Sequence, residues 1–165
     1  MKTQMNSLPS GLAVVIYEDT VASLRSDIED LLPAHYEELA KSKDRMVLSP
    51  AWERYEVMET AGNLLTLSAY VDDKLAGYSV NIVDTHLHYS GLKYAHNDLL
   101  FLHKDYRRGS LGLRLIRETE IAAREHGAEM MAWHAKPGTT LDKLLQLRVA
   151  RGRAQVQDII YSGAL

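Results

Sequence analysis

The chain has 165 residues, 46% of them hydrophobic, which suffices for one substantial core and is too short for two comfortable domains. With 19 Lys and Arg against 22 Asp and Glu, it has no overall positive charge to attract nucleic acid or an anionic membrane. It has no cysteine, which excludes disulfides, cysteine nucleophiles and thiolate metal sites and agrees with a cytoplasmic location.

The first segments of the chain predict a tail followed by one domain. Residues 1–11 contain no apolar stretch of signal-peptide length, so we expect a flexible tail before a single domain at residues 12–165. No segment approaches the length of a membrane span. The β-branched run at residues 12–17 predicts a buried first strand.

Two helical segments follow this strand. Apolar residues recur at helical spacing over residues 21–40, and Asp19 is a candidate cap for that helix. Pro33 interrupts the pattern, so we expect a kink or two short helices. The Ser49–Pro50 pair gives a second helix a cap and a proline at its first position, and Gly62 is the expected end of that helix.

The pattern then changes to strands. Residues 64–71 and 75–83 flank a polar connection suited to an antiparallel hairpin. The polar sequence at residues 85–93 predicts a loop, and residues 94–102 predict a third long strand.

The last third of the chain returns to helices. Residues 109–126 give the clearest helix, followed by a strand at 129–135, a helix at 140–150 and a strand at 154–162. Strands before and after the long helix imply a right-handed crossover and at least one parallel pair. The fold class expected is therefore α/β (α+β), a mixed and mostly antiparallel central sheet flanked by helices.

The sequence LLFLHKDYRRGSLGLRLI, at residues 99–116, joins a buried strand to the long helix through a turn suited to an anion. Helix N-termini leave backbone N–H groups unpaired and carry positive partial charge. Gly109 and Gly112 allow a close approach of the backbone, and Arg107 and Arg108 add charge-assisted bonds. The segment matches neither G-x-G-x-x-G nor the P-loop pattern. The alternative is a solvated β-to-α turn without a ligand.

This segment resembles motif A of the GNAT family, the GCN5-related N-acetyltransferases. The residues that carry the resemblance are Leu102-His103-Lys104-Asp105-Tyr106-Arg107, followed by Arg107-Arg108-Gly109-Ser110-Leu111-Gly112. The expected element order also matches that family from about residue 12 to the C-terminus. Two departures are Ser110 in place of the first motif glycine and Lys104 in place of the usual proline. Many members carry a tyrosine acid four residues before a Gly-Phe pair, where this chain has Arg148 and Gly152-Arg153.

The resemblance implies an acetyl-CoA-dependent N-acetyltransferase, in which a primary amine attacks the thioester directly. The acetyl group is expected between the splayed strands that contain Leu100 and Ala132, with a backbone N–H near Leu100 as oxyanion donor. The residues expected to bind the coenzyme are Leu100, Leu102, Arg107, Arg108, Gly109, Ser110, Leu111, Gly112 and His134. For His134, a solvated strand edge is the equal alternative.

The candidate catalytic residues lie on the motif A strand. Alternate residues share one face if no bulge intervenes, which groups Tyr94, His96, Asp98, Leu100 and Leu102. A carboxylate or imidazole in a central strand is costly unless it is hydrogen-bonded, so these two polar groups need an explanation. We interpret Asp98 as the base, acting directly or through water, with His96 as the alternative. A purely structural pair at the sheet end is the equal alternative.

Three further residues are candidates for the acceptor side. His88, in the HLHY sequence, lines the acceptor cleft in our interpretation; a metal site with His86 is the weaker alternative because no third ligand is nearby. His35 and Tyr36 lie beyond Pro33, where the family usually covers the acceptor, although Tyr36 also fits core packing. No metal is expected.

Two rival functions stay open at this stage. The missing tyrosine also fits a catalytically silent GNAT-fold module that binds CoA or a protein partner. A nucleic-acid or protein-binding domain is the third hypothesis, with basic residues at Arg107, Arg108, Arg114, Arg117, Arg148, Arg151 and Arg153. The sequence leaves the acceptor and the oligomeric state, monomer or homodimer, undetermined.

Overall fold

The computed structural model describes residues 2–7, 13–40, 43–107 and 109–157. The chain forms two compact units, residues 1–133 and 134–165, and each is described by itself. The single domain expected over residues 12–165 stays a prediction. No helix in these four ranges is long and apolar enough to cross a membrane.

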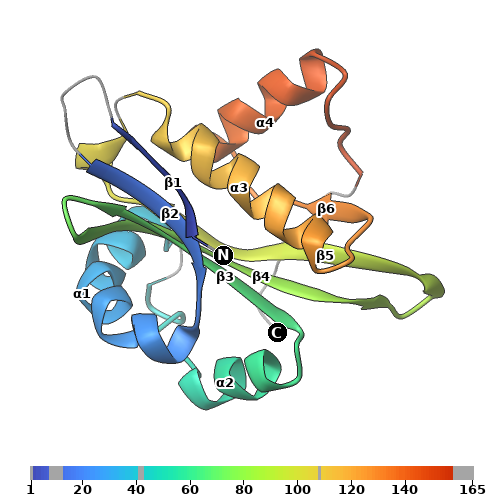
Figure 1. The fold of residues 1–165 in the computed structure, drawn as a ribbon, viewed down its shortest axis with the longest axis horizontal. Coiled ribbons are helices and arrows are strands. Elements are labelled where there is room, and N and C mark those ends of the chain that lie inside the picture. The colour runs from blue at the N-terminus through green and yellow to red at the C-terminus, as the bar shows by residue number, and fades with distance from the viewer. Residues whose placement is uncertain (1, 8–12, 41–42, 108, 158–165) are drawn as a thin grey trace. The chain divides into compact units, whose positions relative to one another are not determined.

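A six-stranded sheet forms the centre of the first unit, with its strands arranged in chain order (Figure 1). The strands are β1 Lys2–Ser7, β2 Ala13–Asp19, β3 Leu64–Val71, β4 Lys74–His86, β5 Tyr89–Leu102 and β6 Met130–Ala132. All neighbours are antiparallel except β5 and β6, which are parallel. The mixed, mostly antiparallel sheet and its parallel pair are thus confirmed.

Strand β1 lies within the segment for which the sequence predicted a flexible tail. It pairs antiparallel with β2, for example Lys2 with Tyr17 and Ser7 with Ala13. Backbone hydrogen bonds hold an edge strand whatever its side chains, so a polar sequence can form one without an apolar pattern. Periodicity therefore carried no signal for this strand.

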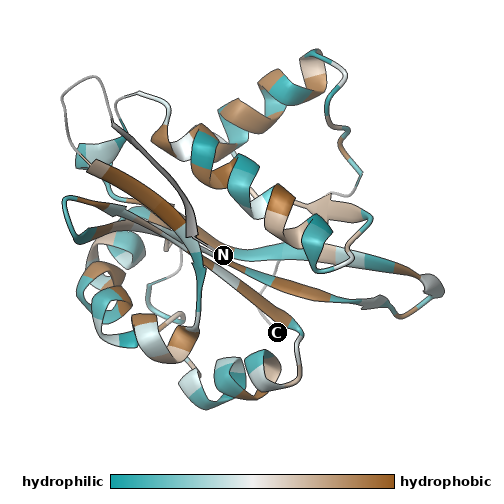
Figure 2. Ribbon diagram, viewed as in Figure 1, coloured by the Kyte–Doolittle hydropathy of each residue, from teal (hydrophilic) through white to brown (hydrophobic). Residues whose placement is uncertain are grey.

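Helices cover both faces of the sheet in this unit. α1 Val21–Leu39 and α2 Trp52–Thr60 pack on one face, and α3 Leu111–Glu125 packs on the other (Figure 1). One apolar cluster lies under α1 and α2 and a second lies under α3. Figure 2 shows the hydrophobic residues concentrated on the strands between these layers.

The starts of α1 and α2 differ from the predictions, while the end of α2 agrees. Thr20, not Asp19, caps α1 by accepting from the Ser23 N–H, and α1 continues through Pro33 as one helix. Pro33 is exposed, so water can satisfy the carbonyl that lacks its donor. α2 begins two residues after the expected Ser49–Pro50 cap, and Gly62 ends it at a φ of 75°.

Two hairpins of the sheet, β3–β4 and β4–β5, are tight. Asp72 and Asp73 connect β3 to β4 with φ of 47° and 62°, the pair of left-handed residues that a type I′ turn requires. The loop predicted at residues 85–93 is instead mostly strand, because β4 runs to His86 and β5 begins at Tyr89. Cross-strand hydrogen bonds extend this hairpin despite its polar side chains.

The second unit contains one helix among its described residues, α4 Thr140–Ala150, as predicted. Thr139 caps it by accepting from the Asp142 N–H. Residues 154–157 are not in a strand, and the rest of the strand predicted at 154–162 lies outside the described residues. The strand predicted at residues 129–135 is shorter in the structure, where β6 covers only Met130–Ala132 of the first unit.

Candidate active site

A bulge at Asp98 divides β5 into two halves. Asn97 pairs with Asn81 and Leu99 pairs with Val80, which leaves Asp98 as an extra residue without a partner on β4. Such an insertion reverses the side-chain alternation beyond it. The expectation that His96, Asp98, Leu100 and Leu102 share one face is therefore wrong.

The two faces of β5 follow from the contacts beyond the bulge. Leu99 and Phe101 pack with the cluster under α1 and α2, whereas Leu100 and Leu102 pack with the cluster under α3. His96 lies opposite Ile82, which also packs toward α1 and α2. The candidate base and the leucines expected at the coenzyme thus lie on opposite faces of the sheet.

Buried amide groups brace this bulge. The Asn97 side-chain nitrogen donates to the Leu99 carbonyl at 2.8 Å, to the Val80 carbonyl at 3.3 Å and to Oδ1 of Asn81 at 3.0 Å. Asn97 and Asn81 are each at most 1% exposed. Because buried polar groups must find partners, this network fixes the backbone on both sides of Asp98.

Strand β5 also leaves β6 near the bulge. Their parallel register covers three pairs, ending with His96 and Ala132, while β5 continues on β4 to Leu102. The edge of β5 beyond His96 is thus without a strand partner on the β6 side within the described part of the chain. Backbone groups on such an edge are available to an extended ligand.

The turn after β5 begins α3. A short 3₁₀ helix, Lys104–Tyr106, precedes Arg107, and Gly109 adopts a φ of 102°. The Ser110 side chain makes no capping bond, and the first helical bond runs from the Arg114 N–H to the Ser110 carbonyl. The N–H groups of the first helical residues therefore point out of the helix end, as an anion site requires.

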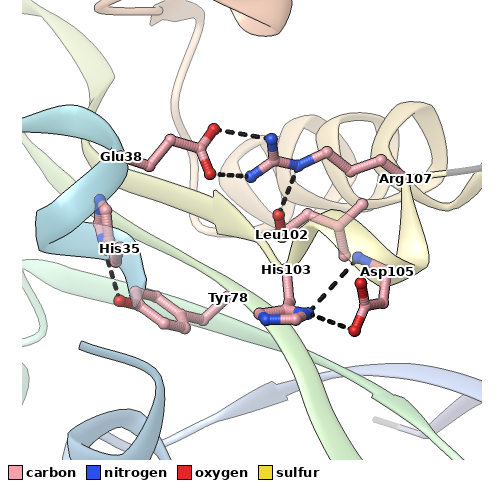
Figure 3. Close-up of polar contacts among 7 residues, drawn as sticks. All are labelled: His35, Glu38, Tyr78, Leu102, His103, Asp105 and Arg107. Carbon is pink, nitrogen blue, oxygen red and sulfur yellow. Dashed lines mark hydrogen bonds and ion pairs between the residues drawn. The ribbon is translucent and has the colours of Figure 1, made fainter. Parts of the chain in front are cut away.

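The Arg107 side chain is engaged by the protein itself (Figure 3). Its Nε donates to the Leu102 carbonyl at 2.7 Å, and its two terminal nitrogens donate to the two carboxylate oxygens of Glu38 at 2.7 and 2.6 Å. The hydrogen bond from Arg107 lowers the pKa of Glu38. Arg107 is therefore not part of an open basic patch, and Arg108 lies outside the described residues.

Asp98 is exposed and contacts α2. The Tyr55 hydroxyl donates to Oδ2 of Asp98 at 2.7 Å. Burial, followed by this hydrogen bond, raises the pKa of Tyr55. A cavity of about 20 Å³ lies beside this pair between α1, α2 and the sheet. Its lining consists of Val21, Ile28, Leu32, Pro50, Trp52, Tyr55, Tyr78, Val80 and Leu99.

The two candidates on α1 have defined partners. His35 is 8% exposed, and its Nδ1 lies 2.7 Å from the Tyr78 hydroxyl (Figure 3). Its ring also stacks on that of Phe101, with the ring centres 4.7 Å apart. Tyr36 donates to the Met46 carbonyl at 2.7 Å, which ties α1 to the segment before α2. His35 is thus in the core, and acceptor contact by either residue stays a prediction.

The histidines of the second hairpin form a row of rings with two tyrosines. His86 lies 6.0 Å from His88, 4.7 Å from Tyr89 and 5.1 Å from Tyr94, and Tyr94 lies 5.9 Å from His96. No group of three or more potential metal ligands occurs in the described ranges. His88 is exposed at the turn, where a role toward the acceptor stays a prediction.

The remaining candidates lie in the second unit. His134 is exposed, and Arg148, at the position of the family tyrosine, lies half-buried in α4. Their roles toward the coenzyme stay predictions.

Comparisons with known proteins identify the class of fold. The model of the acetyltransferase (GNAT) family matches residues 25–142. The chain belongs to that family, and it is therefore an acyltransferase of the GNAT type. No curated protein sequence matches the chain.

Solved structures share this fold at low identity. A ribosomal-protein-alanine N-acetyltransferase from Brucella melitensis biovar Abortus 2308 superposes with a TM-score of 0.69 at 18% identity, covering 93% of this chain and 99% of that one. An aminoglycoside acetyltransferase from an uncultured soil metagenomic sample, in complex with trehalose, gives 0.66 at 18%, covering 92% and 96%. AAC(6')-Iy with the bisubstrate analogue CoA-S-monomethyl-acetylneamine gives 0.61 at 16%, covering 92% and 98%.

Sequence reasoning missed two residues of this site. Glu38 gave no local signal, because its partner Arg107 is 69 residues away. Tyr55 was not among the candidate site residues, because an aromatic ring on a helix is more often a core residue. It does pack against the core, but its hydroxyl also reaches Asp98.

Proposed function

We propose that this protein transfers an acetyl group from acetyl-CoA to a primary amine by direct attack within a ternary complex. The observation that carries the proposal is the path of β5. This strand leaves β6 after His96, just before the bulge at Asp98, and then leads to the turn at the open N-terminus of α3. One strand thus connects a candidate base to a candidate diphosphate site.

The turn fits a coenzyme diphosphate. Gly109 has a left-handed φ of 102°, which favours a residue without Cβ. A Cβ placed on Gly112 would meet only Leu102 Cδ2, at 3.5 Å, so the backbone is open there to a close ligand. Backbone donors of Ser110, Leu111 and Gly112 would hold the phosphates, while the edge of β5 at Leu100 and the N–H of Leu102, whose carbonyl is bonded to Arg107, would hold the pantetheine arm.

Asp98 supplies the base in this proposal. Tyr55 holds Oδ2, and Oδ1 faces the acceptor or a bridging water. The carboxylate takes the proton of the ammonium, the amine nitrogen forms a bond to the thioester carbonyl carbon, and a backbone N–H near Leu100 stabilises the oxyanion. As the C–S bond breaks, the nitrogen loses its second proton through water to the departing thiolate, and Asp98 later releases its proton to solvent. His96 is the alternative base on the same face.

The acceptor is proposed to approach from the α1 and α2 side, because Asp98 faces that side. Solved proteins of this fold include acetyltransferases named for aminoglycosides and for a ribosomal-protein alanine, so an amine of a small molecule or of a protein is the expected acceptor class. We place the reaction in the cytoplasm.

Calorimetry with CoA tests the turn, using two isosteric variants. Gly112→Asp places a negative charge at the helix N-terminus and should abolish CoA binding, whereas Gly112→Asn has the same shape without the charge and should retain much of it. Equal affinity of the two variants would argue against a diphosphate at this position.

Thioester cleavage with a panel of primary amines tests the chemistry. Wild-type protein should release CoA in an amine-dependent manner, and Asp98→Asn should lower kcat/KM by roughly 10²- to 10⁴-fold, the usual contribution of a general base. CoA binding without turnover on any amine would favour the silent module, which Arg148 at the tyrosine position motivates.

A further inference from the structure

The Arg107 guanidinium joins three parts of the first unit. Nε donates to the carbonyl of Leu102, the last residue of β5, and both terminal nitrogens donate to Glu38 in the last turn of α1 (Figure 3). All three nitrogens of the guanidinium therefore donate hydrogen bonds within the protein. Two parallel bonds to one carboxylate fix orientation as well as distance.

The surroundings of this ion pair make it more persistent than an ordinary surface pair. The Arg107 side chain is 28% exposed and that of Glu38 is 41% exposed. The guanidinium carbon also lies 5.8 Å from the centre of the Phe101 ring. The His35 ring stacks on the same phenylalanine. Partial exclusion of water and a ring contact both favour a fixed guanidinium.

The same face of α1 carries both contacts to this region. His35 and Glu38 are three residues apart, so they share a helix face. His35 is bonded to Tyr78 of β4 and stacks on Phe101 of β5, while Glu38 holds Arg107 just beyond β5. The end of α1 is thus attached to the strand and to the turn that starts α3.

We propose that Glu38 is a positioning residue for coenzyme binding: it holds Arg107, and through Arg107 it fixes the turn that presents the N-terminus of α3. The inference rests on the proposed function, in which that turn binds CoA. In this inference the Arg107 guanidinium does not contact the coenzyme. It serves instead as a brace that connects α1, Leu102 and the turn. A turn that is already ordered loses less conformational entropy when it binds a ligand.

A brace and a direct ligand predict opposite results for Glu38→Gln. If Arg107 braces the turn, removing the carboxylate charge weakens CoA binding. If Arg107 binds the diphosphate, removing Glu38 frees the guanidinium and CoA binds equally well or more tightly. Arg107→Gln weakens binding in both cases, so the Glu38 variant is the informative one.

The experiment is a double-mutant cycle of CoA affinity measured by calorimetry well below the unfolding temperature. We expect Glu38→Gln and Arg107→Gln each to weaken binding by about tenfold, and the double variant to be no weaker than either single one, because both remove the same brace. Glu37→Gln is the matched control. The Glu37 carboxylate, next to Glu38 in the chain, pairs with Lys43 at 2.7 Å, so this substitution should leave the affinity for CoA unchanged.

Kinetics separate a brace from a general loss of structure. Glu38→Gln should raise the KM for acetyl-CoA by about tenfold with a much smaller effect on kcat, and Glu38→Asp, which keeps the charge, should recover part of the loss. Unchanged or tighter CoA binding by Glu38→Gln, or additive losses in the double variant, would overturn the inference. Failure of the wild-type protein to bind CoA would instead overturn the proposed function.

Discussion

The Tyr55 hydroxyl donates a hydrogen bond of 2.7 Å to Oδ2 of Asp98, which connects helix α2 to the bulge in β5. The bond forms because Asp98 lies on the same face as His96, toward α1 and α2, and because Tyr55 packs its ring against the core beneath that face. One carboxylate oxygen of Asp98 is thereby held in place. The Asn97 amide supports this arrangement from the opposite face.

The first prediction concerns Tyr55→Phe, which keeps the ring and removes the bond to Asp98. A hydrogen bond to a charged group is worth about 1.5–3 kcal/mol, so a freely rotating carboxylate should lower kcat by about tenfold or more. Steady-state kinetics with acetyl-CoA and an accepted amine provide the measurement. Tyr70→Phe is the control, since the Tyr70 hydroxyl, on β3, makes an equivalent hydrogen bond of 2.8 Å to Asp27 of α1. Similar kcat values for both variants would remove Asp98 from the proposed chemistry.

The second prediction concerns Asn97→Ala, which removes the donor that spans the bulge. Two backbone carbonyls and the Asn81 oxygen would lose that partner in a buried site, which costs about 1–3 kcal/mol in the free energy of unfolding. Urea denaturation followed by circular dichroism measures this loss. Asn63→Ala removes only a 3.3 Å contact with Asp84 at an exposed position and should cost much less. If the two variants were equally stable, the amide network would not be what holds the bulge.

The third prediction concerns Gly77, which lies opposite Leu102 on β4. A Cβ at this position would lie 2.5 Å from the Phe101 carbonyl oxygen and 2.9 Å from the Leu102 Cα, so Gly77→Ala must push the end of β5 away. Overpacking of this kind costs about 1–3 kcal/mol, which thermal unfolding will detect. Gly91→Ala, also in a strand, meets nothing within 4 Å and should leave the melting temperature nearly unchanged. A tolerated Gly77→Ala would mean that the two strands separate there without cost.

Local patterns were sufficient to predict the main elements of this fold. The helical pattern marked α3, Gly62 marked the end of α2, and the polar connection after residue 71 marked the β3–β4 turn. Strand β1 was missed because an edge strand needs only backbone partners. The loop predicted at residues 85–93 was wrong because cross-strand pairing extends a polar hairpin beyond its apolar part.

The site was less predictable because its geometry depends on distant residues. The bulge at Asp98 exists through Asn97 and its partners on β4, and alternation alone cannot reveal an inserted residue. Glu38 and Arg107 are each ordinary charged residues in sequence, and only the fold brings them together. The glycines and open helix end of the turn, in contrast, were predictable because an N-terminal anion site is a local feature.

The last prediction concerns acid stability and follows from the ion pair of Glu38 with Arg107. The hydrogen bond from Arg107 holds the pKa of Glu38 below its ordinary value of 4.5. A carboxyl group with a lowered pKa in the folded state contributes stability that is fully present above its unfolded pKa and is lost as the pH falls through the folded pKa. Wild-type protein should therefore lose stability below about pH 4.5 more steeply than Glu38→Gln, whose side chain does not titrate.

Urea denaturation at several pH values between 3 and 7 measures this difference. The two curves of unfolding free energy against pH should lie apart at neutral pH and converge in acid. In acid, protonation of Glu38 removes the ion pair from the wild-type protein, whereas Glu38→Gln lacks that ion pair at every pH. The separation should be small, since both side chains keep partial contact with water. Glu37→Gln should run parallel to the wild type, because its carboxylate is 71% exposed. Curves for wild type and Glu38→Gln that stay parallel down to pH 3 would show that the ion pair contributes nothing to the folded state in solution.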